Sequence, residues 1–181
     1  MAYTPTENRL GVQPIGATVT TSTLYQSGQS TQLNPQHALG TIVRAEDPTY
    51  GGGEFIYLKG VASTVVGSLV SYDPVNGTTT LSSTSEASSD RPLAVAMAAC
   101  VSGYYGWYQI AGAAVIKKGA VAVTPGVPLY LSGVTAGRVT SLASGGRQLM
   151  NCRAVNAATV ASATSTITAI IQRPFAQGAI T

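Results

Sequence analysis

The chain has 181 residues, which suits one domain of moderate size with a buried core. Only 9% of its residues are Asp, Glu, Lys or Arg, compared with about 25% in ordinary soluble domains, and the net charge is +3. A surface made of Ser, Thr, Gly, Asn and Gln can be covered by a neighbour without the desolvation of many ions, so the composition favours a protein that works inside an assembly; secreted and adhesive β proteins share this feature.

Residues 1–40 are rich in Thr, Ser, Gln, Gly and Pro, and their apolar residues are too sparse for a core. Three prolines discourage a continuous helix. We therefore predict an extended N-terminal arm, either disordered or ordered on a neighbour, whose removal leaves a folded domain with weakened attachment. Its predicted anchor points on a partner are Leu10, Val12, Ile15 and Leu24.

Residues 41–181 are predicted to form one β-rich domain. The first strand signal is "GGGEFIYLKGVAS", in which Phe55 and Tyr57 lie on one face while Ile56 and Leu58 lie on the other. A phosphate-binding loop needs a Gly-Lys-Ser/Thr step that opens a helix, whereas these glycines precede a strand. We therefore interpret them as a structural corner.

Three carboxylates, Glu46, Asp47 and Glu54, flank that corner. They could accept a cation, but an ion pair between subunits, with Arg44, with Lys59 or with a partner, is the simpler interpretation. We predict them as partner-interface residues.

Two segments, 67–83 and 126–144, each indicate a strand, a turn and a Thr-rich strand. The run "PLAVAMAACV" indicates a strand with one small face, and a short Ala-rich helix that begins at Pro92 is the alternative. "GWYQIAGAAVI", "TITAIIQ" and "QLMNCRAV" are further strands, the last with Met150, Cys152 and Ala154 facing inward. Together these signals predict a compact antiparallel β-barrel or sandwich.

The segment "GYYGWYQ" concentrates the rings of Tyr104, Tyr105 and Trp107. Such rings are favoured at protein interfaces, because they bury much area at a small rotamer cost. We predict these three as partner-interface residues, while a core cluster at the start of a strand and a sugar-stacking site stay open as alternatives.

Nothing in the sequence indicates catalysis, a metal site or a cofactor. The one histidine, His37, ends the arm; no serine lies in a Gly-x-Ser-x-Gly elbow; and no carboxylate follows Asp90. Cys100 and Cys152 lack metal-ligand spacing, so we expect two buried thiols, with a disulfide as the alternative. We predict that the chain is not an enzyme.

Charge divides the chain into an acidic and a basic part. Residues 1–91 carry a net charge of −3, whereas residues 92–181 carry +6 without one acidic side chain. The six basic residues, apart from one Lys pair, are scattered along the sequence, which favours contact between copies or with an oppositely charged protein over nucleic acid. With no signal-peptide pattern and no apolar run long enough for a bilayer, we expect a chain made in a cytoplasm without a membrane partner.

The segments "GTIVRAEDPTYGGGEFIYLKGVAST", "LVSYDPVNGTTTL", "RPLAVAMAA", "GWYQIAGAAVIKKGAV" and "GRQLMNCRAV" resemble, in their order, the capsid decoration (cement) proteins of tailed bacteriophages. The similarity covers roughly residues 40–175. It implies a small β-rich domain, usually a homotrimer, on the outer surface of the phage head, where it clamps neighbouring major capsid proteins against the pressure of packaged DNA. The host would be bacterial, and the chain would be made in its cytoplasm.

Two other functions stay open at this point. One is a phage tail or spike-type virion protein that binds host-surface glycan through the Tyr/Trp segment. The other is a hydrolase that uses a hydroxyl group and a carboxylate near Glu54.

Overall fold

The computed structural model describes residues 3–6, 14–16, 18–19, 35–82 and 91–178. These residues form twelve β-strands and no helix, so the described part of the chain has no helix that could span a membrane. The all-β prediction is confirmed. The strands are β1 (Thr4–Pro5), β2 (Thr18–Val19), β3 (Ile42–Asp47), β4 (Gly51–Lys59), β5 (Leu69–Tyr72), β6 (Thr79–Leu81), β7 (Leu93–Ala96), β8 (Tyr105–Lys117), β9 (Pro128–Leu131), β10 (Val139–Thr140), β11 (Gln148–Ala154) and β12 (Thr166–Ala176).

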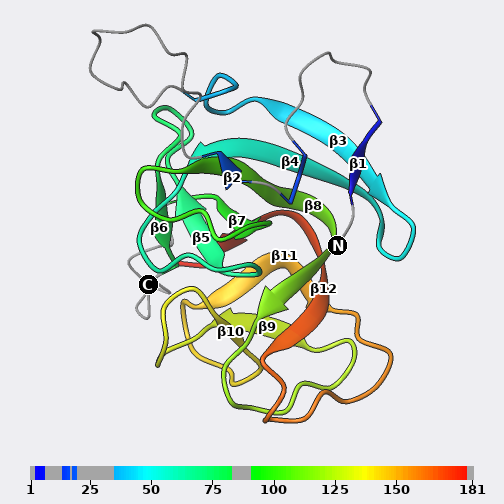
Figure 1. The fold of residues 1–181 in the computed structure, drawn as a ribbon. Coiled ribbons are helices and arrows are strands. Elements are labelled where there is room, and N and C mark those ends of the chain that lie inside the picture. The colour runs from blue at the N-terminus through cyan, green and yellow to red at the C-terminus, as the bar shows by residue number, and fades with distance from the viewer. Residues whose placement is uncertain (1–2, 7–13, 17, 20–34, 83–90, 179–181) are drawn as a thin grey trace, which may run out of the picture.

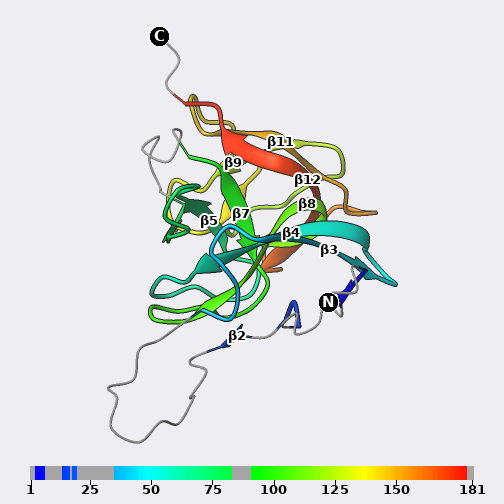
Figure 2. The same ribbon diagram turned by 90° about the horizontal axis from the view of Figure 1, so that it is seen from above.

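The strands join into one antiparallel sheet that does not close into a barrel and is consistent with a sandwich-like domain. The main path runs β1-β3-β4-β8-β12-β11-β9-β10, with β3 and β4 towards one end and β9 and β10 at the other (Figure 1). The central strand is β8, which pairs with β4, β2, β7 and β12. β7 in turn pairs with β5, beside which it lies in Figure 2, and β5 pairs with β6.

The core consists of three apolar clusters separated by the sheet. The side chains of β4 alternate as predicted: Phe55 and Tyr57 belong to one cluster, and Ile56 and Leu58 to another. The third cluster joins β8, β9, β11 and β12 to β5 and β7. Because β4 is apolar on both faces, it must be covered on both, as the clusters show.

The predicted hairpins are confirmed. Tyr72 pairs with Thr79 across the first turn, where Asp73 Oδ1 accepts hydrogen bonds from the backbone N–H groups of Val75 and Asn76. The second hairpin is formed by β9 and β10. The run from residue 92 begins with strand β7, all of it buried, and not with the alternative helix.

In β11 the prediction for Met150 is wrong, whereas Cys152 and Ala154 face inward as expected. The inward residue at the start of the strand is Leu149. The cause is the left-handed conformation of Asn151, with φ of 56°, which breaks the two-residue alternation where the register of β11 shifts against both β9 and β12.

The described parts of the N-terminal segment lie on this chain's own sheet. β1 pairs with β3, and β2 pairs with β8. The side chains of Tyr3 and Ile15 are buried in the cluster that contains Phe55 and Tyr57. This arrangement differs from an arm ordered only on a neighbour. The sequence did not reveal it, because the local pattern does not show that one face of β4 lacks a cover. The predicted domain boundary at residues 40 and 41 stays a prediction.

Replacing Cys152 with alanine should make the free energy of unfolding less sensitive to alkaline pH. Cys100 and Cys152 are both free and buried, and burial raises the pKa of the Cys152 thiol to about 12. An unfolded thiol has a pKa of about 8.5, so between these values the unfolded chain has lost a proton that the folded chain keeps. The free energy of unfolding of the wild type should therefore fall by about 1.4 kcal/mol per pH unit, because of this thiol, as pH rises.

Urea unfolding with a reductant present, at several pH values between about 8.5 and 11, checks this slope. The variant's slope should be shallower by about the contribution of one thiol. Equal slopes in the two proteins would contradict the assignment of a protonated buried thiol.

Candidate functional site

The glycine-rich segment forms the corner between β3 and β4, as predicted. Asp47 Oδ1 accepts hydrogen bonds from the backbone N–H groups of Thr49, at 2.8 Å, and Tyr50, at 3.1 Å. Gly51 then takes a positive φ of 73°, which non-glycine residues rarely adopt. Asp47 is buried and its carboxylate holds the turn together, so its role here is to build the corner.

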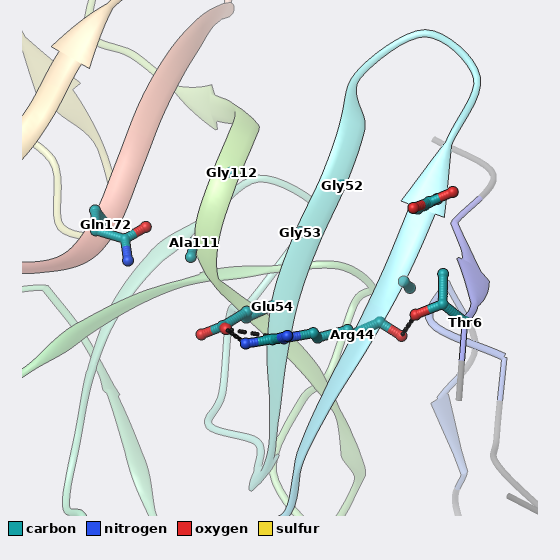
Figure 3. Close-up of a pocket in the computed structure, with 10 residues that line it drawn as sticks. Thr6, Arg44, Gly52, Gly53, Glu54, Ala111, Gly112 and Gln172 are labelled. Atoms are coloured by element: carbon teal, nitrogen blue, oxygen red, sulfur yellow. Dashed lines mark hydrogen bonds and ion pairs between the residues drawn. The ribbon is translucent and has the colours of Figure 1, made fainter. Parts of the chain in front are cut away.

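Beside this corner is a hollow of about 330 Å³ on the surface of the sheet (Figure 3). Its lining comes from β3, β4, β8, β12 and the N-terminal segment, and consists of Thr6, Arg44, Ala45, Glu46, Gly52, Gly53, Glu54, Ala111, Gly112 and Gln172. Where β4 and β8 run side by side, the lining is mostly backbone, because glycines occupy both strands. The backbone itself, without side chains to cover it, therefore forms this part of the lining.

Replacing Gly112 with alanine should lower the free energy of unfolding by about 2 kcal/mol or more. Gly112 has φ of 100°, and a Cβ there would collide with the carbonyl oxygen of Gly52 on β4. Gly52→Ala is a matched control, because a Cβ at Gly52 meets no atom within 4 Å and its φ is ordinary. Thermal unfolding of both variants checks this; equal losses would show that the close approach of the strands is not what requires glycine at Gly112.

Glu54 is held in the hollow by two arginines. Its Oε1 lies 3.2 Å from Arg44 Nη2, on the neighbouring strand, and its Oε2 lies 3.0 Å from Arg173 Nη2, on β12. The pair with Arg44 forms within one chain, whereas the sequence analysis expected an ion pair between subunits, and the pair with Arg173 was missed because 119 residues separate the partners. The Glu54 side chain is 20% exposed, and both its oxygens accept from guanidinium groups, so it forms a structural ion pair with each arginine.

The three predicted carboxylates do not form one site. Glu54 and Glu46 line the hollow, while Asp47 bonds to its own turn. Within the ranges that the structure describes, no group of three or more His, Cys, Asp or Glu side chains is placed to hold a metal ion.

The aromatic segment lies mainly in the core. Tyr105 and Trp107 are buried, and the Trp107 ring is 5.0 Å from the ring of Tyr57 and 5.3 Å from that of His37. These two residues therefore fit the alternative of a core cluster at the start of a strand. As placed here, they expose almost no surface to a partner. Tyr104 is half-buried against a neighbouring cluster.

Of the four predicted anchors in the N-terminal segment, Ile15 is in the core, only 1% exposed. It anchors the segment to its own domain. Leu10, Val12 and Leu24 lie outside the described residues, so their predicted contacts stay predictions.

One functional feature that the sequence analysis missed is a fully buried lysine at the end of β8. Lys118 Nζ donates to the backbone carbonyls of Gly119 (3.2 Å), Val121 (2.7 Å) and Ser162 (3.3 Å). Burial lowers the pKa of this amine. A signal was present: Lys118 is two residues after the inward-facing Ile116, and side chains of a strand alternate.

Both oxygens of Glu54 are paired with arginines, and the lining between β4 and β8 is mostly backbone. The hollow therefore offers polar contacts more readily than acid-base chemistry. It is therefore suited to receiving groups from another molecule. Comparison of the chain with protein-family models, with curated proteins and with solved structures finds no match.

Proposed function

We propose that this chain is a structural virion protein, a capsid decoration protein that binds the outside of a phage head. The observation that carries the proposal is a surface with few charges and with large apolar side chains exposed. From residue 92 onward, the exposed ones are Val134, Leu142, Val155, Ile170 and Phe175. Isolated exposed apolar residues are normal, but only 9% of this chain's residues are charged, so a partner can cover its surface with the desolvation of few ions.

The proposed mechanism is mechanical. The chain, as a homotrimer, bridges neighbouring major capsid proteins and so holds the shell against the pressure of its DNA. A trimer presents each contact three times, and tethered contacts act at a high effective concentration, so modest patches give a durable clamp. The hollow at Glu54, with exposed backbone and two arginines, would add polar contacts to such an interface.

The alternative of a tail or spike protein that binds glycan has less support. It depended on an accessible Tyr/Trp segment, but the rings of Tyr105 and Trp107 pack in the core. The hydrolase alternative is weakened in the same way, since both carboxylate oxygens of Glu54 are paired with arginines.

The test is to mix the purified protein with undecorated heads of the virus that encodes it, and to sediment the heads. The proposal expects the protein to co-sediment, to raise the resistance of the heads to heat or chelator, and to appear on the head in electron micrographs. Failure to bind heads, or binding confined to the tail, would overturn it.

A further inference from the structure

The turn between β9 and β10 presents Val134, whose side chain is 92% exposed, the highest value among the large apolar side chains of the described residues. The turn is internally bonded. Ser132 Oγ accepts from the backbone N–H groups of Val134, at 3.3 Å, and Thr135, at 3.2 Å, and Ser132 N–H donates to the carbonyl of Arg138 at 3.0 Å. These bonds fix the backbone that carries the valine.

The base of the turn is also fastened to the neighbouring hairpin. Gly137 N–H donates to the carbonyl of Ser82 at 3.0 Å, and Leu69 N–H donates to the carbonyl of Gly137 at 2.9 Å. Gly137 has a positive φ of 75°, and a Cβ there would press on the side chain of Leu81. A tip held in this way loses little conformational entropy when it binds, which favours a contact made by a single exposed side chain.

Two arginines flank this tip. The Nη1 atom of Arg147 lies over Gly133, where a Cβ would collide with it, and Leu131 N–H fixes the Arg147 backbone by donating to its carbonyl at 2.9 Å. On the other side of the turn, Arg138 Nη1 donates to the carbonyl of Lys118 at 3.4 Å. The fold thus gathers basic residues that are scattered along the sequence.

The strands around the tip supply no opposite charge. No Asp or Glu occurs from residue 91 to the last residue. Guanidinium groups pair well with carboxylates, and arginine around a central apolar contact is typical of binding hot spots. A nucleic acid would attract the arginines but would have no pocket for a valine side chain.

We propose that this arginine-flanked turn, residues 132–138 with Arg147, is a docking tip for an acidic protein surface. Val134 enters an apolar depression on the partner, and Arg138 and Arg147 face its carboxylates. The inference rests on the proposed function, in which the partner surface belongs to the major capsid protein; it adds which part of the chain binds and which charge the partner carries.

The test uses Val134→Asp and a matched control, Val75→Asp. Val75 is 87% exposed at the tip of the β5–β6 turn, so both valines are replaced at exposed tips, but the backbone N–H of Val75 is bonded to a carboxylate, that of Asp73. We expect Val134→Asp to weaken co-sedimentation with undecorated heads by at least about tenfold and Val75→Asp by less than about twofold. Thermal unfolding should be nearly unchanged in both variants.

A second variant, Arg138→Gln, should weaken binding and make it less dependent on salt. If the wild type binds heads but Val134→Asp binds equally well, the docking tip is wrong and the decoration function stands. If the wild type does not bind heads, both fail. If the wild type binds a double-stranded DNA fragment and Arg138→Gln loses that binding together with head binding, the partner is nucleic acid and the inference is overturned.

Discussion

Removal of residues 1–19 should lower the free energy of unfolding by about 5 kcal/mol or more. The segment contributes two buried side chains, Tyr3 and Ile15, to the cluster around Phe55 and Tyr57, and truncating one such side chain typically costs about 2–5 kcal/mol. Tyr3 also donates from its hydroxyl to the carbonyl of Ala113 at 2.9 Å. Since whole domains are stable by only about 5–15 kcal/mol, the shortened chain should be close to unfolding.

Guanidinium unfolding, followed through the fluorescence of Trp107 in the same cluster, measures the loss. Because a deletion can fail to fold, Tyr3→Ala and Ile15→Ala test the same contacts singly, each with an expected loss of about 2–4 kcal/mol. Thr4→Ala, at an exposed position between them, should change stability by less than about 0.5 kcal/mol. Single variants as stable as the wild type would show that the segment is a detachable arm after all.

The local features of the fold could be predicted because they depend on residues close in sequence. The alternation of Phe55 and Tyr57 with Ile56 and Leu58 needs only the two-residue period of a strand. The turn at Asp73 needs only side chains that bond to their own backbone. The corner before β4 needs only glycine's access to positive φ.

Features that depend on pairing between distant segments could not be predicted. The alternation in β11 fails at Asn151, where the register against β9 and β12 shifts, and no local pattern marks that residue. Glu54 takes Arg173 as a partner only because β4 and β12 flank β8 in the sheet. For the same reason, the sequence left open whether Trp107 lies in a core or at an interface.

The candidate site was predicted only in part. Its corner and the pair of Glu54 with Arg44 follow from the hairpin, in which these two residues face each other. The hollow itself needs the approach of β4 and β8 at Gly53 and Gly112, which only the sheet order brings together. The arginine-flanked turn likewise combines residues that are distant in sequence, Arg147 and the turn from 132 to 138.

Replacing Lys118 with methionine should lower the free energy of unfolding by about 1–3 kcal/mol. Methionine fills similar space but donates no hydrogen bond, so the carbonyls of Gly119, Val121 and Ser162 lose the ammonium that they share. The Gly119 carbonyl keeps a second donor, the Val121 N–H at 2.8 Å, and Ser162 is exposed to water, so the loss falls mainly on the half-buried carbonyl of Val121, at about 1–3 kcal/mol. Removing the buried charge offsets part of this loss of stability, because burial disfavours the charged amine, as its lowered pKa shows.

The loss of the hydrogen bonds from the ammonium should outweigh that gain. No carboxylate in this half of the chain pairs with Lys118, so these bonds to carbonyls are what stabilises its charge. The neighbour Lys117, which is half-buried and on the other face of β8, supplies the matched control: Lys117→Met should cost less than about 1 kcal/mol. Urea unfolding of the two variants measures the difference. If both are as stable as the wild type, the ammonium is not what joins the end of β8 to the β11–β12 connection, and the support beneath Arg138 must come from the backbone alone.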